Sequence, residues 1–99
     1  MIINYDTNNP VALGDKPVLL DFYAEWCGPC RMLGKVLDDY SDKHPELLIV
    51  KVDVDECEGI VEEYGVSNLP TLIYHEPLGI KWRHTGSMTI KQLEELLNA

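Results

Sequence analysis

Two cysteines separated by two residues are the feature of this sequence best suited to do chemistry. Cys27 and Cys30 enclose Gly28 and Pro29, and Trp26 precedes them. A single C-x-x-C near a βαβ pattern is typical of an intracellular redox motif. Residues three apart in a first helical turn lie side by side, compatible with the roughly 4.4–6.8 Å between the Cα atoms of a disulfide. The pair therefore predicts disulfide exchange, and the alternative is two ordinary buried cysteines flanking a turn.

The two cysteines are not expected to act alike. A helix N-terminus carries partial positive charge and unpaired N–H groups, which favour a thiolate over a thiol. Pro29 suits such a turn because its missing N–H is one that the helix would leave unpaired. We therefore expect Cys27, at the outer end, to be the nucleophile and Cys30 to be the resolving thiol. Cys57 lies far along the chain and is interpreted as a structural or idle thiol.

Length and charge limit the other function classes. The chain has 99 residues, the size of one domain, so residues 1–99 are expected to form a single domain. Its formal net charge of −9 argues against binding to nucleic acid or an anionic membrane surface. No apolar run approaches the roughly 20 residues of a membrane span, and residues 1–6 do not resemble a secretory signal. These features predict a soluble protein of the cytoplasm.

The elements that must position the cysteines alternate between strand and helix patterns. Residues 18–23 form a nearly continuous apolar run, typical of a central strand covered on both faces. Before that run, Asn9, Pro10 and Gly14 suggest one helical turn over residues 9–14. The remaining expected elements are an edge strand at 1–4, helices at 29–44, 58–64 and 90–97, a strand at 47–54, and a hairpin of 71–75 with 80–84.

The segment from Asp21 to Arg31, DFYAEWCGPCR, resembles the active-site segment of the thioredoxin family, including its Gly-Pro dipeptide. The likeness extends from about residue 17 to the C-terminus through residues 51–55, the Leu69-Pro70-Thr71 segment, Gly86 and the last helix. It implies an α/β thioredoxin fold, a central mixed sheet of four to five strands flanked by helices on both faces. The segment before Lys16 is shorter than is usual in the family, so we expect a trimmed first strand and helix.

The resemblance decides how Asp21 is interpreted. From the sequence alone, an Asp within an apolar strand is either a strand-end residue that reaches water or a costly buried acid. The resemblance implies the second: a buried acid beneath the disulfide that moves the proton of Cys30. It likewise implies that Lys51 sits close to that acid, where the sequence alone allows an ordinary solvated lysine.

Substrate-binding residues are also implied by the resemblance. Thioredoxin-like proteins carry a cis proline facing the cysteine pair, which here is Pro70, and Leu69 before it offers its backbone to an extended substrate. Trp26 is expected on the surface beside the nucleophile, with a half-buried packing role as the alternative. The further residues assigned to substrate binding are Gly28, Pro29 and Gly86.

Three function classes follow. The first is a thiol-disulfide oxidoreductase that reduces protein disulfides through Cys27 and Cys30. A thioredoxin reductase is expected to reduce it again, so that it serves as an electron carrier. It is expected to act as a monomer and without a cofactor. The second is a disulfide-forming oxidase or isomerase, which the Gly-Pro dipeptide and the lack of a leader disfavour. The third is a binding module or processivity-type subunit. A structural zinc site wants four N or S ligands, and one C-x-x-C does not supply them, so no metal is expected.

Overall fold

The protein is built around one mixed sheet. The computed structural model describes residues 1–13 and 15–98, and over these residues five strands lie in the order β1-β3-β2-β4-β5. Strands β1, β3 and β2 run parallel, whereas β4 is antiparallel to both β2 and β5. The elements are β1 (Ile2–Asn4), β2 (Val18–Tyr23), α1 (Gly28–Lys43), β3 (Leu48–Asp53), α2 (Glu58–Tyr64), β4 (Thr71–Glu76), β5 (Gly79–Thr85) and α3 (Ile90–Leu97).

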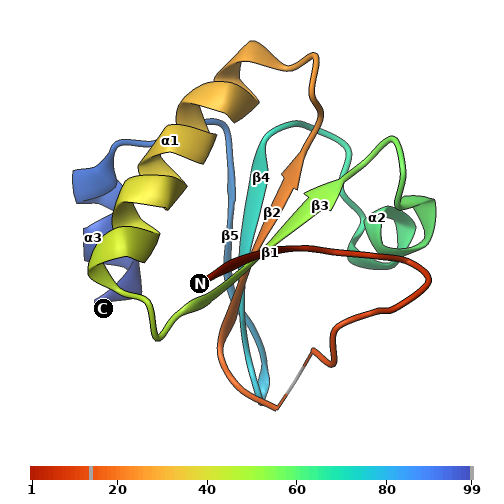
Figure 1. Ribbon diagram of the computed structural model, residues 1–99, viewed down its shortest axis with the longest axis horizontal. Helices are drawn as coiled ribbons and strands as arrows, with labels where there is room; N and C mark the ends of the chain where they lie inside the picture. Colours follow the sequence, from red (N-terminus) through yellow and green to blue (C-terminus); the bar gives the residue numbers. More distant parts are fainter. Residues whose placement is uncertain (14, 99) are drawn as a thin grey trace.

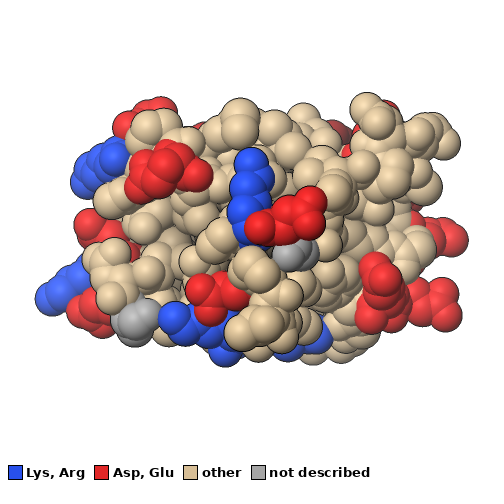
Figure 2. Space-filling view, turned by 90° about the horizontal axis from the view of Figure 1, so that it is seen from below, with Lys and Arg blue, Asp and Glu red and all other residues tan. Residues whose placement is uncertain are grey.

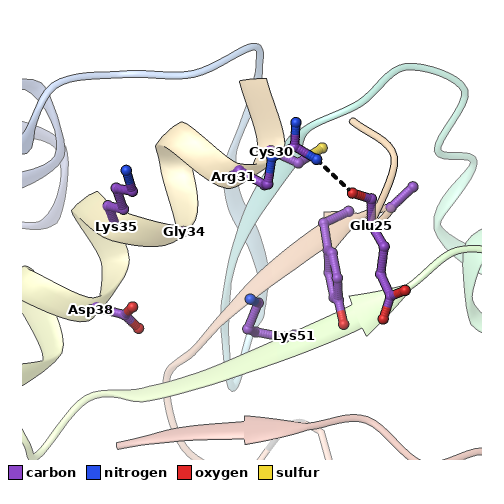
Figure 3. A pocket seen from close by; sticks show the side chains of 9 residues that line it. Glu25, Cys30, Arg31, Gly34, Lys35, Asp38 and Lys51 are labelled. Carbon is purple, nitrogen blue, oxygen red and sulfur yellow. Dashed lines mark hydrogen bonds between the residues drawn. The ribbon is translucent and has the colours of Figure 1, made fainter. Parts of the chain in front are cut away.

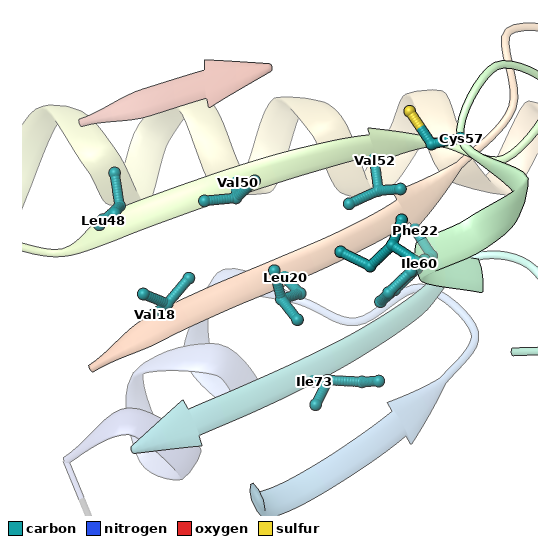
Figure 4. Close-up of a cluster of buried hydrophobic side chains, with 9 residues drawn as sticks. All are labelled: Val18, Leu20, Phe22, Leu48, Val50, Val52, Cys57, Ile60 and Ile73. Atoms are coloured by element: carbon teal, nitrogen blue, oxygen red, sulfur yellow. The ribbon is translucent and has the colours of Figure 1, made fainter. Parts of the chain in front are cut away.

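Helices cover both faces of this sheet, which confirms the predicted fold class. Figure 1 shows α1 and α3 together on one side and α2 on the other. Apolar side chains of β2 alternate between the two faces, since successive residues of a strand point in opposite directions. Figure 4 shows the core on the α2 side, where Leu20, Phe22 and Ile73 lie near Cys57 and Ile60. Leu19 points the other way and packs with Leu33, Leu37 and Leu93 of α1 and α3.

Helix α1 positions the cysteine pair and agrees with the predicted range. Its buried residues are Cys30, Leu33, Leu37 and Tyr40, a spacing that puts one apolar stripe against the sheet. The helix continues without interruption through Gly34 and Lys35 and ends at the cap residue His44, before Pro45. Core packing along this stripe fixes α1, and the N-terminus of the helix presents Cys27.

Helix α2 ends and helix α3 begins where their sequence signals predict. Gly65 closes α2 with a left-handed backbone, at φ 62°, which glycine adopts at no steric cost. The Arg83 guanidinium from β5 donates hydrogen bonds to the carbonyls of Tyr64 and Gly65, at 2.6 and 3.5 Å. Thr89 and Gln92 form the predicted capping box of α3. The Arg83 hydrogen bonds therefore tie the end of α2 to β5, and the capping box fixes the start of α3.

The bulky Trp82 on β5 has a packing role. Its ring lies 5.7 Å from that of Tyr74, centroid to centroid, on the paired strand β4. Both rings pack against the core that α1 and α3 share. The side chain therefore extends that core over the outermost strand, which has a neighbouring strand on one side only.

The predicted helical turn over residues 9–14 is wrong for the residues described. Residues 10–13 are not helical, and Gly14 lies outside the described residues. Val11 and Leu13 both pack against the α2-side core with exposed Ala12 between them, an extended pattern with a period of two. A single turn fixes several backbone angles for one hydrogen bond, so burial of two side chains outweighs the Asn-Pro start signal.

The surface charge is spread out. Figure 2 shows acidic and basic side chains interspersed over the described part of one face, without one dominant acidic area. No helix among the described residues has the length and apolar character needed to cross a membrane.

Candidate active site

Cys27 and Cys30 form a disulfide at the N-terminus of α1. Their Cα atoms are 5.2 Å apart, within the range expected from the sequence. Cys27 is the cap residue with extended backbone, at φ −88° and ψ 113°, and Pro29 stands in the first turn. The backbone N–H of Cys30 donates to the Sγ of Cys27 at 3.2 Å. A sulfur at Cys27 therefore receives a hydrogen bond and the positive end of the helix dipole, both of which stabilise a thiolate.

The disulfide is shielded, but its surroundings are open. Cys27 and Cys30 are only 6% and 4% exposed, whereas Trp26 is 70% exposed. The indole Nε1 of Trp26 donates to the Asp55 carboxylate at 2.9 Å, which holds the ring on the surface beside Cys27. Gly28 is half-buried and Pro29 exposed. The shielded disulfide is therefore bordered by an exposed aromatic ring and an exposed proline.

A second segment meets the disulfide from the sheet. The Leu69–Pro70 peptide bond is cis, as the resemblance predicts. Leu69 packs against the small cluster of Ala24, Cys27 and Cys30. The N–H of Gly86 donates to the carbonyl of Pro70 at 2.8 Å, and Gly86 has a φ of 98°, a conformation suited to glycine. Leu69, Pro70 and Gly86 are thus brought to the same edge as the cysteines.

Asp21 is buried on the α1 side of the sheet. It is 1% exposed, and neither carboxylate oxygen has a hydrogen-bond partner among the described residues. Burial raises the pKa of the Asp21 carboxyl to about 7 from an ordinary value of 3.8, and the Lys51 ammonium offsets part of this by lowering it. The structure therefore favours a buried acid over a solvated one at this position. A carboxyl with such a pKa can take or give a proton near neutral pH.

Lys51 occupies the position opposite Asp21. The two residues are register partners in the parallel pairing of β2 and β3. The Nζ of Lys51 lies 4.5 Å from the centroid of the Tyr23 ring, a cation–π contact. Lys51 therefore stands near the acid, as expected, but it is held by an aromatic ring that the sequence reasoning did not single out.

A pocket of about 410 Å³ opens to solvent beside Cys30, Tyr23 and Lys51. Figure 3 shows Lys51 on β3 facing α1 near Gly34, with Cys30 at the start of that helix. The Arg31 guanidinium, also drawn there, donates to the backbone carbonyl of Glu25 at 2.9 Å. The pocket is lined by Tyr23, Ala24, Glu25, Cys30, Arg31, Gly34, Lys35, Asp38 and Lys51. Water can thus approach the inner cysteine from the flank of α1.

Sequence reasoning missed Tyr23 and Asp55 as parts of the site. Tyr23 counted only as the end of an apolar run, and Asp55 only as a member of a matching segment. Each acquires its contact from a distant residue, Lys51 or Trp26, and no local spacing signals such a pair. Cys57, by contrast, is free and buried, with its Sγ 3.8 Å from the carbonyl oxygen of Tyr5.

Comparison with known proteins gives consistent matches. The family model described as Thioredoxin matches residues 3–99. The chain is 46% identical over 81 residues to Thioredoxin of Alicyclobacillus acidocaldarius subsp. acidocaldarius, which covers 81% of this chain and 69% of that protein. It is 37% identical over 90 residues to Thioredoxin of Pseudomonas aeruginosa, covering 90% of this chain and 83% of that one.

A solved structure has the same arrangement of elements. The X-ray structure of Fasciola hepatica thioredoxin superposes with a TM-score of 0.77 at 30% sequence identity. The likeness covers 87% of this chain and 81% of that chain. The residues matched by the family model, 3–99, include the cysteine pair and the strands β2 to β5.

Proposed function

Because this chain belongs to the thioredoxin family and is a thiol-disulfide oxidoreductase that acts through Cys27 and Cys30, we propose that Cys27 is the attacking nucleophile and Cys30 the resolving thiol. One observation carries this assignment. The Cys27 sulfur accepts the Cys30 N–H at the start of α1, so negative charge on that sulfur is stabilised in the reduced protein. Cys30 lies one turn inside the helix, and among the described residues no N–H donates to its sulfur.

The proposed cycle moves two electrons from the protein to the substrate. The Cys27 thiolate attacks one sulfur of a substrate disulfide, forming a mixed disulfide and releasing the first substrate thiolate. Cys30 then loses its proton and attacks the Cys27 sulfur. The mixed disulfide breaks, the second substrate thiolate leaves, and the Cys27–Cys30 disulfide forms. Both substrate thiolates take up protons at neutral pH, and a reductase must reduce the pair again.

Asp21 is proposed to accept the proton of Cys30 in the second step. It lies on the α1 side of β2, and a pKa of about 7 lets it exchange a proton at neutral pH. Lys51, its register partner, is proposed to stabilise the ionised carboxylate. The pocket beside Cys30 is also lined by Lys51, so water can reach both of these residues from the flank of α1.

Substrate chains are proposed to bind across the exposed rim of the disulfide. Leu69 packs against the cysteine cluster, and within the described residues its backbone N–H and carbonyl form no hydrogen bond. These groups are suited to pair with an extended chain, as in strand addition at a sheet edge. The surface proposed to contact the chain consists of Trp26, Gly28, Pro29, Leu69, Pro70 and Gly86.

The cellular setting is also part of the proposal. We propose that residues 1–99 work as one domain and as a monomer, in the cytoplasm, where free thiols persist. The partners are protein disulfides and a thioredoxin reductase as electron donor, so the protein serves electron transport and redox homeostasis. The free Cys57 is compatible with a reducing compartment. The Gly-Pro dipeptide favours this reducing role over an oxidase or isomerase.

Insulin reduction tests the proposal. With dithiothreitol as donor, the wild type should speed the precipitation of reduced insulin, and Cys27→Ser should lower the rate to that of dithiothreitol alone. Cys57→Ala is the matched control, because it also removes one thiol, and it should retain the wild-type rate. Wild-type activity in Cys27→Ser would contradict the assignment. A reduction potential near −120 mV, which is well above the potentials of disulfide reductants, would instead indicate an oxidase.

A further inference from the structure

Lys51 has few contacts that fix its ammonium group. Among the described residues the Lys51 ammonium forms no ion pair and no hydrogen bond, and its Nζ lies 4.5 Å from the centroid of the Tyr23 ring. A Cβ placed on Gly34 would lie 4.0 Å from the same Nζ, so α1 leaves room on that side. The aromatic face therefore determines where the positive charge stands.

The position of that charge matters to Asp21. The carboxyl accepts no hydrogen bond from any described residue, so Lys51 acts on it through space alone. An electrostatic attraction of this kind weakens as the distance grows, and it is strongest where water is excluded. A Lys51 side chain that left the Tyr23 ring for solvent would be better hydrated and would stabilise the carboxylate less.

Other charged groups surround the same pocket. Burial, and to a smaller extent neighbouring carboxylates, raise the pKa of the Tyr23 hydroxyl. The side chain is therefore neutral at physiological pH. The carboxylates in question are Asp53, Glu25, Asp21 and Glu56. From α1 the lining residues with charge are Arg31, Lys35 and Asp38. All of these except Asp21 lie toward solvent, where salt screens them more strongly than the buried carboxyl.

We propose that Tyr23 is a positioning residue for disulfide exchange: its ring holds the Lys51 ammonium where that charge acts on the Asp21 carboxyl. This inference rests on the proposed function, because Asp21 is taken there as the acceptor of the Cys30 proton. Tyr23 also packs against the cluster of Ala24, Cys27 and Cys30, but its proposed role in the reaction does not depend on that contact. Its effect on the reaction passes through Lys51 and Asp21, and the face of the ring, not the hydroxyl, carries it.

The direct test is the titration of Asp21 followed by carboxyl ¹³C NMR on the oxidised protein. Tyr23→Leu removes the aromatic face and should move the Asp21 midpoint upward by about half a pH unit. Tyr23→Phe keeps the face and should leave the midpoint where it is in the wild type. If Tyr23→Leu does not fold, Tyr23→Met is measured instead, since its flexible side chain fills a similar volume.

A second background separates Lys51 from simple changes in burial. In Lys51→Met, where no ammonium remains to be held, Tyr23→Leu should shift the Asp21 midpoint no further. An equal shift in both backgrounds, or no shift in either, would overturn the inference. The pH profile for resolution of a mixed disulfide should move with the NMR midpoint. The NMR titration needs no turnover. If the expected shifts of the Asp21 midpoint are found but the wild type fails to reduce insulin, the result counts against the proposed function only.

Discussion

Asp21 on β2 and Lys51 on β3 are direct neighbours in the parallel register, and yet the Asp21 carboxyl accepts no hydrogen bond from any described residue. The two groups are close enough for Lys51 to lower the pKa of the acid, although burial has the larger and opposite effect. This combination leaves a carboxyl that is costly to ionise in the folded protein. Because the cost of ionising Asp21 arises only in the folded state, it lowers the free energy of unfolding and can be measured as a loss of stability.

Replacing Asp21 by Asn should stabilise the oxidised protein at neutral and alkaline pH. The pKa of Asp21 is raised to about 7 in the folded state, so the folded protein keeps a proton that the unfolded chain releases above about pH 4. The penalty is therefore absent at low pH, grows between about pH 4 and pH 7, and is constant above that. The gain in Asp21→Asn should approach about 4 kcal/mol at pH 8 as an upper limit.

Urea unfolding of both oxidised proteins between pH 4 and pH 8.5 measures this gain. The two stabilities should converge toward the acid end of that range, because a protonated Asp and an Asn are both neutral. Lys51→Met is a useful companion, since it should deepen the penalty at pH 8 while leaving low-pH stability nearly unchanged. A constant difference at every pH would show that Asp21 ionises in the folded protein as it does in the unfolded chain.

Gly34→Ala should stabilise the protein by about 0.5–1 kcal/mol. Gly34 lies within α1, and an added Cβ would meet only the Nζ of Lys51, at an ordinary contact distance of 4.0 Å. The gain comes from the lower backbone entropy of Ala in the unfolded chain. Thermal and urea midpoints give the measurement.

The same substitution at Gly65 is the matched control. Gly65 has a left-handed backbone, at φ 62°, so Ala there should destabilise the protein by about 1 kcal/mol. Opposite signs at the two glycines are the expected result. A loss of stability in Gly34→Ala would mean that the Lys51 side chain cannot accommodate the added methyl group.

Cys57→Ser should leave the reduction potential of the Cys27–Cys30 pair and the rate of insulin reduction unchanged. Cys57 is 3% exposed and belongs to the α2-side core, apart from the cluster that holds the disulfide. Stability should fall modestly, by about 1 kcal/mol, because a hydroxyl replaces a thiol in an apolar setting. A disulfide between Cys57 and either active-site cysteine in the native oxidised protein would contradict this prediction.

Much of the fold was predictable because its local signals agree with the tertiary packing. The apolar run of β2, the i and i+3 stripe of α1, and the capping box of α3 each describe a surface that the fold then buries. The failure at residues 9–14 has a physical reason. One Asn-Pro start signal describes a turn of marginal stability, and the core competes for Val11 and Leu13.

The candidate site likewise has residues that local sequence signals predict and residues that they do not. Cys27 and Cys30 are only three positions apart in the chain, so their chemistry follows from spacing and a helix start. The cis Leu69–Pro70 bond and the burial of Asp21 followed from the family resemblance, because neither has a reliable local signal. The contacts of Lys51 with Tyr23 and of Trp26 with Asp55 join residues far apart in the sequence, and only the folded chain brings them together.

Trapping of a mixed disulfide tests the central claim most directly. Cys30→Ser removes the resolving thiol, so a disulfide-bonded substrate such as insulin should remain covalently attached to the protein. Peptide mapping by mass spectrometry, without reduction, should find the substrate cysteine joined to Cys27, and Cys27→Ser should form no such adduct. Attachment through Cys57 in Cys30→Ser, or an adduct on Cys30 as the main product in Cys27→Ser, would contradict the assignment of Cys27 as the nucleophile.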